Sequence, residues 1–269
     1  MRELRAMDFV LLLLVMLLRQ EVAGLKLQHI RVPTYLLSGE NAFLECGYDL
    51  ETEKLYAISW YKDQEEFYKF IARGETNKHS YPVAGVKVDY RHSDDHQVIL
   101  QNVSLHTSGQ YRCEISAEAP SFEAVSGEAS MEIIELSQEK PVIVGEEKVY
   151  ASGDVLALNC TSGKSHPAAQ LKWFVNGQQV KPNLEIVFEQ HGLYSTISTL
   201  LLVLEPGHLV GDKINVRCEA TVRSSRADVA QPFIDMRATE VFVQGHASFA
   251  TPSLCLLAVA VLQRLLLPV

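Results

Sequence analysis

Short stretches in which apolar and polar residues alternate follow one another through the first half of the chain. Alternation with a period of two is typical of strands that bury one face of a sheet. Strands are expected at Leu27–Val32, Ala42–Cys46, Ala57–Lys62, Phe67–Ala72, Val98–Val103 and Phe122–Ile134. The pattern therefore predicts an all-β domain over residues 25–136.

A second series of the same kind begins after a short polar linker, Ser137–Pro141. Its clearest member is the strand-like stretch Tyr194–Leu200. The series continues to Gln244 and predicts a second all-β domain over residues 141–244. The chain of 269 residues is thus expected to carry two β domains in a row.

Four of the five cysteines stand at positions that indicate one plan for both domains. In the first domain Cys46 is followed by Trp60, and Tyr111 stands two residues before Cys113. An immunoglobulin sandwich needs this set, because the two cysteines join strands B and F of packed sheets and the indole packs against the disulfide. The sequence therefore predicts an immunoglobulin-like sandwich with a Cys46–Cys113 disulfide.

The second domain repeats the set with Cys160, Trp173 and Cys218, which predicts a second disulfide between its two cysteines. The interval from Trp60 to Val98 leaves room for the additional strands C′ and C″ of a variable-type domain. The shorter spacing in the second domain leaves no room for C″. The predicted fold class is all-β, with two tandem immunoglobulin-like β-sandwiches, variable-type and then constant or C2-like.

The beginning of the chain reads as a signal peptide over residues 1–24. Arg2 and Arg5 precede an apolar run, Phe9–Leu18, and small residues come after it at the expected cleavage position. The run is too short to cross a bilayer as a helix. An extracellular, oxidising compartment agrees with the paired cysteines.

The end of the chain, residues 245–269, resembles a signal for attachment of a glycosylphosphatidylinositol (GPI) anchor. Small residues beginning with Gly245, the expected attachment site, precede a polar spacer and an apolar run. A transmembrane span and simple secretion are the alternatives. The apolar run Leu254–Leu262 is short for a span, and Arg264 separates it from the last apolar residues of the chain. Removal of the tail would also remove Cys255.

Charge and motifs argue against nucleic-acid binding and against catalysis. The net charge of −9 disfavours a nucleic-acid partner, which requires basic patches. Gly163-Lys164-Ser165 lacks the first glycine of a phosphate-binding loop, and Asp94-Asp95-His96 lacks further ligands for a cation. We therefore expect no enzyme activity, no cofactor, no metal and no small-molecule substrate.

Two Asn-x-Ser/Thr sequons predict glycosylation at Asn102 and Asn159. Such triplets also arise by chance, and the middle residue of the second is Cys160. Asn102 is the stronger of the two candidates.

A partner-binding surface is expected on the front sheet of the first domain, which contains strands C, C′, F and G. If Trp60 and Tyr111 point inward, their neighbours along the strands point outward. The candidate partner-binding residues are Tyr61, Asp63, Tyr68, Phe70, Arg112 and Glu114. Aromatic residues and arginine are frequent interface hot spots. The simpler alternative is that strand C′ shields Tyr61 and that Arg112 pairs with Glu114.

These stretches resemble the beaten path (Beat) family of insect neuronal immunoglobulin proteins. In the first domain the resemblance rests on Trp60–Asp63, Glu66–Tyr68 and the run Tyr111–Phe122. In the second it rests on Asn159–Ser162, Ser165, Pro167-Ala168 and Leu171-x-Trp173. The resemblance covers nearly all of the chain after the signal peptide.

The resemblance implies a variable-type domain followed by a second immunoglobulin domain, secreted or attached to the membrane. It also implies heterophilic binding, in trans, to immunoglobulin receptors of the sidestep family, in axon guidance and synaptic partner choice. The alternative function is a soluble secreted ligand or decoy that modulates adhesion of other receptors.

Overall fold

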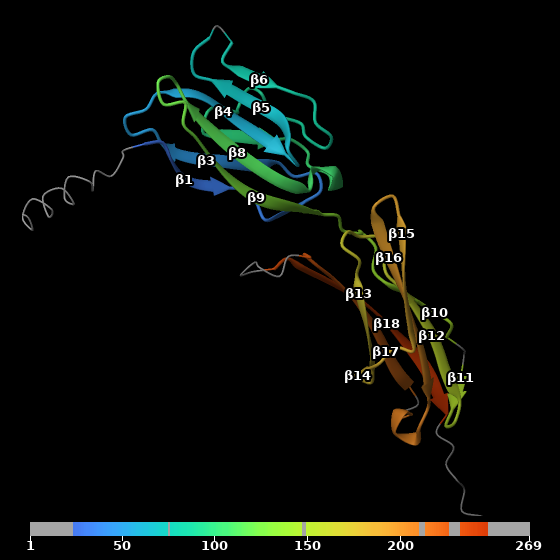
Figure 1. The fold of residues 1–269 in the computed structure, drawn as a ribbon. Coiled ribbons are helices and arrows are strands. Elements are labelled where there is room, and N and C mark those ends of the chain that lie inside the picture. The colour runs from blue at the N-terminus through green and yellow to red at the C-terminus, as the bar shows by residue number, and fades with distance from the viewer. Residues whose placement is uncertain (1–23, 75, 147–148, 210–212, 226–231, 247–269) are drawn as a thin grey trace, which may run out of the picture. The chain divides into compact units, whose positions relative to one another are not determined.

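The computed structural model describes residues 24–74, 76–146, 149–209, 213–225 and 232–246 (Figure 1). The expected signal peptide, but for Gly24, and most of the expected anchor segment lie outside these ranges. The chain divides into two compact units between Ile133 and Ile134. None of the helices in the described ranges is long and apolar enough to span a membrane.

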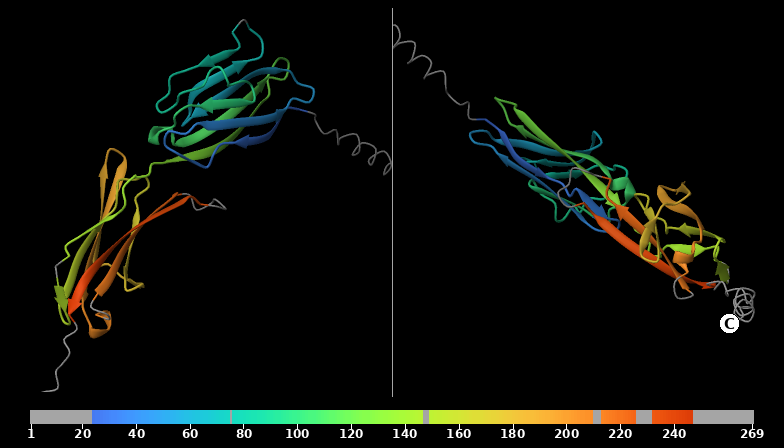
Figure 2. Two further views of the ribbon diagram at one scale, coloured as in Figure 1. Left: turned by 180° about the vertical axis from the view of Figure 1, so that it is seen from behind. Right: turned by 90° about the horizontal axis from the view of Figure 1, so that it is seen from below.

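The first domain is a sandwich of two sheets (Figures 1 and 2). The front sheet has six strands in the order β2 (Tyr35–Leu37), β9 (Ala124–Ile134), β8 (Gly109–Ala117), β4 (Leu55–Lys62), β5 (Glu65–Ile71) and β6 (Lys78–Ser80). The facing sheet has three strands in the order β1 (Lys26–Arg31), β3 (Ala42–Asp49) and β7 (Gln97–Leu100). A short 3₁₀ helix, η1 (Leu105–Thr107), leads into β8.

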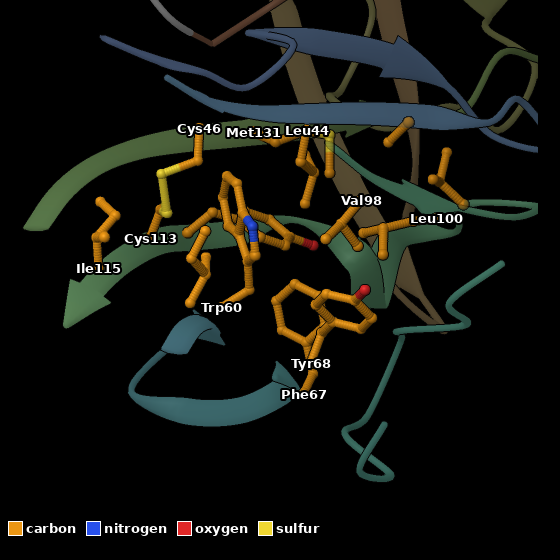
Figure 3. Close-up of a cluster of buried hydrophobic side chains, with 14 of the residues drawn as sticks. Leu44, Cys46, Trp60, Phe67, Tyr68, Val98, Leu100, Cys113, Ile115 and Met131 are labelled. Carbon is orange, nitrogen blue, oxygen red and sulfur yellow. A yellow bond between two sulfur atoms is a disulfide. The ribbon is translucent and has the colours of Figure 1, made fainter. Parts of the chain in front are cut away.

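The core of the first domain forms around the predicted Cys46–Cys113 disulfide, which is present. Trp60 lies beside it and is buried between the sheets (Figure 3). Tyr111 is also buried, and its hydroxyl donates a hydrogen bond of 2.6 Å to the carbonyl of Thr107. This contact is the tyrosine corner of immunoglobulin folds. It fixes the turn of η1 at the point where β8 begins.

The second domain is a sandwich of four and five strands. One sheet has the order β10 (Val142–Val144), β12 (Val155–Thr161), β16 (Leu193–Val203) and β15 (Leu184–Gln190). The other has the order β11 (Val149–Ala151), β18 (Ile234–His246), β17 (Lys213–Arg223), β13 (Gln170–Val175) and β14 (Gln178–Val180), and η2 (Pro206–His208) precedes β17. Beyond β13 this sheet adds the single short strand β14, whereas a variable-type domain adds both C′ and C″.

The core of the second domain contains the predicted Cys160–Cys218 disulfide. Trp173 is buried against it, and the indole Nε1 donates a hydrogen bond of 3.0 Å to Ser198 Oγ. Val216 occupies the position that Tyr111 has in the first domain and is fully buried. This core thus replaces the tyrosine corner by aliphatic packing.

Candidate functional site

Four outward-facing residues form a row across the front sheet of the first domain. Tyr61 of β4 stands opposite Glu66 of β5 on one side and Arg112 of β8 on the other. Arg112 in turn stands opposite Glu128 of β9. We call these four residues the front row. Because each pair consists of direct cross-strand neighbours, the strand register itself brings the row together.

Arg112 is the centre of the front row. Its Cζ lies 4.2 Å from the centroid of the Tyr61 ring, which is a cation–π geometry. Its Nη1 lies 2.9 Å from Glu114 Oε2, so the pairing of these two residues that the sequence left open is present. The side chains of Arg112 and Glu114 are 25% and 30% exposed. Both therefore remain reachable from solvent while they pair.

The front row holds two buried polar atoms without a hydrogen-bond partner. Arg112 Nε is one, and Glu66 Oε1 is the other, with the ammonium of Lys69 at 3.6 Å, outside hydrogen-bonding distance. Glu128 Oε2 accepts a hydrogen bond of 2.6 Å from Gln110 Nε2. A buried donor left unpaired costs about 1–3 kcal/mol. The row is therefore polar, compact and incompletely satisfied.

The second domain has the same contacts at equivalent positions. The Cζ of Arg217 lies 4.5 Å from the centroid of the Phe174 ring, and its Nη2 lies 3.0 Å from Glu219 Oε1. Its Nε, however, lies 3.9 Å from Glu240 Oε1 on the neighbouring strand. The arginine–aromatic stack is therefore common to both sandwiches. The contact of Arg217 Nε with Glu240 is an ion pair and is too long for a hydrogen bond, so the difference is that Arg112 Nε is buried without a hydrogen-bond partner.

Asp63, a predicted partner-binding residue, has a structural role. It occupies the two-residue turn between β4 and β5 with φ of 48°, a conformation that Asp tolerates. Its carboxylate accepts hydrogen bonds from Lys62 Nζ at 2.6 Å and from the backbone amide of Gln110 at 2.8 Å. The Lys62 hydrogen bond, with help from the amide, lowers the pKa of Asp63 against an opposing effect of desolvation.

The prediction that Tyr68 contacts a partner is wrong, whereas the same prediction for Phe70 stays a prediction. Tyr68 is fully buried, and its hydroxyl donates to the carbonyl of Asp94 at 3.1 Å. Phe70 is partly buried and packs against the same core. The reason is a β-bulge: Trp60 pairs with Tyr68 and Tyr61 with Glu66, which leaves Phe67 as the extra residue. The core side of β5 thus takes Phe67, Tyr68 and Phe70. Burial also raises the pKa of Tyr68.

Sequence reasoning missed several exposed residues of the first domain. Glu66 and Glu128 belong to the front row only through strand register, which no local pattern specifies. Phe122 lies in the β8–β9 loop, two residues before β9 begins, with 74% of its surface exposed and φ of 52°. Together with Tyr56 and Glu118 it lines an open hollow at that end of the sheet. The sequence signal that could have identified Phe122 as exposed is its position, two residues after Pro120.

Comparison with known proteins identifies the type of the second domain. The model of the CD80-like C2-set immunoglobulin domain matches residues 136–228. The second domain is of the C2-set type. The chain is 27% identical to mouse cell adhesion molecule 1 over 128 residues, which make up 47% of this chain and 26% of the mouse protein. The match thus spans about a quarter of the length of that relative.

Solved structures give the same architecture for both domains. The ectodomain of mouse nectin-like molecule 4 superposes with a TM-score of 0.54 and 17% identity, covering 81% of this chain and 67% of that one. The Rst D1-D2 structure superposes with a TM-score of 0.54 and 15% identity, covering 84% of this chain and all of that one. The predicted fold class of two tandem immunoglobulin-like sandwiches is confirmed. The chain is similar to cell adhesion molecules of the immunoglobulin superfamily.

The remaining predicted sites are modification sites. Asn102 and Asn159 are both exposed. Gly245, the expected lipid-attachment residue, lies within β18 opposite Tyr150 of β11 and is buried. A Cβ on Gly245 would come within 2.4 Å of Leu209 Cδ2, so the Leu209 side chain packs directly over this residue. That placement conflicts with attachment at Gly245, because a transamidase must reach the residue it modifies.

Proposed function

We propose that this chain is a cell-surface recognition protein whose first domain binds another immunoglobulin receptor through the front row. The observation that carries the proposal is the state of Arg112, which is partly exposed, stacked on Tyr61 and unsatisfied at Nε. Rotation of the Arg112 guanidinium on binding would turn Nε toward the partner. A hydrogen-bond acceptor on the partner would then satisfy Nε. Similarity to adhesion molecules supports a protein as the partner.

The resemblance to the beaten path family supports a receptor of the sidestep type, on another cell, as that partner. The corresponding role is heterophilic adhesion in axon guidance and synaptic partner choice. The mechanism is binding, or competition with binding, and involves no chemistry. The front row matches such a role because Arg112 and Tyr61 lie among three glutamates: Glu66 and Glu128 of the row and the adjacent Glu114. Binding would therefore depend on charge as well as on contact area.

We also place the protein on the outer face of the plasma membrane through a GPI anchor. Since Gly245 is part of β18, we move the proposed attachment to the next small residues of the sequence, Ala247 and Ser248. The predicted glycans at Asn102 and Asn159 agree with this extracellular location.

The first test measures binding of the protein to a panel of sidestep-type ectodomains. We expect Arg112→Glu to weaken binding by about 30-fold or more, since removal of a hot-spot residue costs at least about 2 kcal/mol. Tyr61→Ala should weaken binding in the same direction. Surface plasmon resonance gives the dissociation constants, and circular dichroism confirms that each variant is folded.

The second domain provides a matched control for this test. Arg217→Glu makes the same charge change at a residue with the same aromatic and glutamate contacts. We expect Arg217→Glu to bind as the unchanged protein does. Equal losses for both arginine variants would indicate a general effect of charge, and unchanged binding by Arg112→Glu and Tyr61→Ala would place the interface elsewhere.

A further inference from the structure

The outer face of the four-stranded sheet in the second domain is unusually apolar. The inward residues of β12 and β16, such as Leu156, Leu158 and Leu200, are buried as expected. The outward positions, however, are also largely aliphatic, with exposed fractions between 49% and 58%: Val142, Val144, Val155, Leu184, Leu201 and Val203. We call this surface the apolar sheet face. An exposed sheet face is normally polar, and a contiguous apolar patch indicates that something covers it.

The strand register makes these side chains contiguous. Val155 stands opposite Val203, Ala157 opposite Leu201, and the β10 valines flank β12 from the other side. Ile186 and Phe188, on the edge strand β15, are also exposed and extend the same face. The patch therefore spans all four strands.

Asn159 lies in the middle of the apolar sheet face. It is exposed on β12, opposite Val144 on one side and Thr199 on the other. Thr199 Oγ1 donates a hydrogen bond of 2.7 Å to Asn159 Oδ1. This contact holds the amide by its oxygen and leaves Nδ2 available. Asn159-Cys160-Thr161 is a sequon, so the polar residue at the centre of the patch is also an acceptor for a sugar.

We propose that an N-linked glycan on Asn159 covers the apolar sheet face. In the transfer, Asn159 Nδ2 forms a bond to C1 of the first sugar of a lipid-linked oligosaccharide. The bond from C1 to the diphosphate oxygen breaks, the lipid diphosphate leaves, and the amide gives up one proton. Because Cys160 is buried next to the acceptor, the transfer precedes the closing of the sandwich.

The glycan is a better occupant of this face than a second copy of the chain. Its attachment point lies at the centre of the patch. The covalent bond to Asn159 therefore keeps the glycan at the apolar sheet face even if the sugars bind this face only weakly. The C–H faces of the sugars can lie against the valines and leucines while the hydroxyls remain in water. The same bulk would prevent two sheet faces from meeting.

The test uses the full chain expressed in animal cells, with glycopeptide mass spectrometry and sedimentation velocity on the purified protein. We expect Asn159 to be occupied and the protein to be monomeric. Asn159→Gln and Thr161→Ala each remove the sequon, and we expect both to self-associate, with about a twofold rise in mass for dimers. Thr161→Ser keeps the sequon, and Asn102→Gln removes the other one; both should remain monomeric.

Removal of the glycan from the folded protein with an endoglycosidase gives the same comparison without any substitution. Self-association and increased binding of an apolar dye after this treatment would support the proposal. An unoccupied Asn159 in the purified protein would overturn it. An occupied Asn159 whose glycan can be removed without a change in mass or dye binding would overturn it as well.

Discussion

Asp63 shows how one carboxylate can hold a turn and a strand together. It accepts hydrogen bonds from Lys62 and from the backbone of Gln110, so it fixes the β4–β5 turn against the start of β8. Gly109 must approach it closely, because a Cβ there would lie 2.6 Å from Asp63 Oδ2. The carboxylate therefore stabilises this end of the front sheet, and its contact with a partner stays a prediction.

The lowered pKa of Asp63 makes this contribution depend on pH. The folded pKa lies below the unfolded value of about 3.9, so the stabilisation is present above that pH and is lost as the pH falls through the folded pKa. We expect Asp63→Asn to reduce the stability of the first domain by about 1 kcal/mol at most at pH 7, because the group is half exposed.

Urea denaturation at pH 7 and at pH 3 checks this expectation. The difference between Asp63→Asn and the unchanged protein should shrink at the lower pH, because pH 3 lies below the unfolded pKa and the unfolded carboxyl is then largely protonated. Glu65→Gln, two residues along in the turn region, serves as the control and should show no such change. A difference of the same size at both pH values would contradict the charge-based explanation.

At the scale of single elements, the bulge in β5 decides which residues reach a partner. Phe67 is fully buried, and its ring meets that of Tyr111 edge to face at a centroid distance of 6.0 Å. We expect Phe67→Ala to destabilise the first domain by about 3–5 kcal/mol through loss of buried surface and a residual cavity. Chemical denaturation followed by tryptophan fluorescence, with Trp173→Phe in both proteins so that Trp60 alone reports, measures the change.

Lys69 provides the comparison for Phe67 on the same strand. It points to the outer side, where its ammonium lies 3.6 Å from Glu66 Oε1. Lys69→Ala should change the stability by no more than about 0.5 kcal/mol, as is usual for surface positions. A small effect of Phe67→Ala, similar to that of Lys69→Ala, would mean that β5 pairs with β4 without the bulge.

The bulge also marks the limit of prediction from the sequence. Cysteine and tryptophan spacing predicted both disulfides, alternation predicted β3 and β4, and the Tyr-x-Cys motif predicted β8, because periodicity and fixed spacing are local properties of the chain. The side to which Tyr68 and Phe70 point depends instead on how β5 pairs with β4. The front row of Glu66, Tyr61, Arg112 and Glu128 depends on three strand registers at once. No local pattern contains that information.

At the scale of the whole molecule, each of the two units has its own buried tryptophan and its own disulfide. In the proposals above, the first unit binds the partner, and the second unit is a spacer covered by a glycan. The last described strand of the second unit, β18, reaches His246 and pairs in parallel with β11 near its end. The described part of the second domain thus includes the residue just before the proposed attachment site.

This arrangement predicts how the tail behaves in cells. We expect the full chain to appear on the surface of animal cells and to be released by a phospholipase C specific for phosphatidylinositol. A chain that stops after His246 should be secreted with both disulfides formed, because β18 is then complete. Replacing Ala247 and Ser248 with leucine should abolish release by the lipase, because the attachment site needs small residues. Appearance of the full chain in the medium without the lipase would instead favour the soluble ligand, in which case the front row would act by occupying receptors rather than by joining cells.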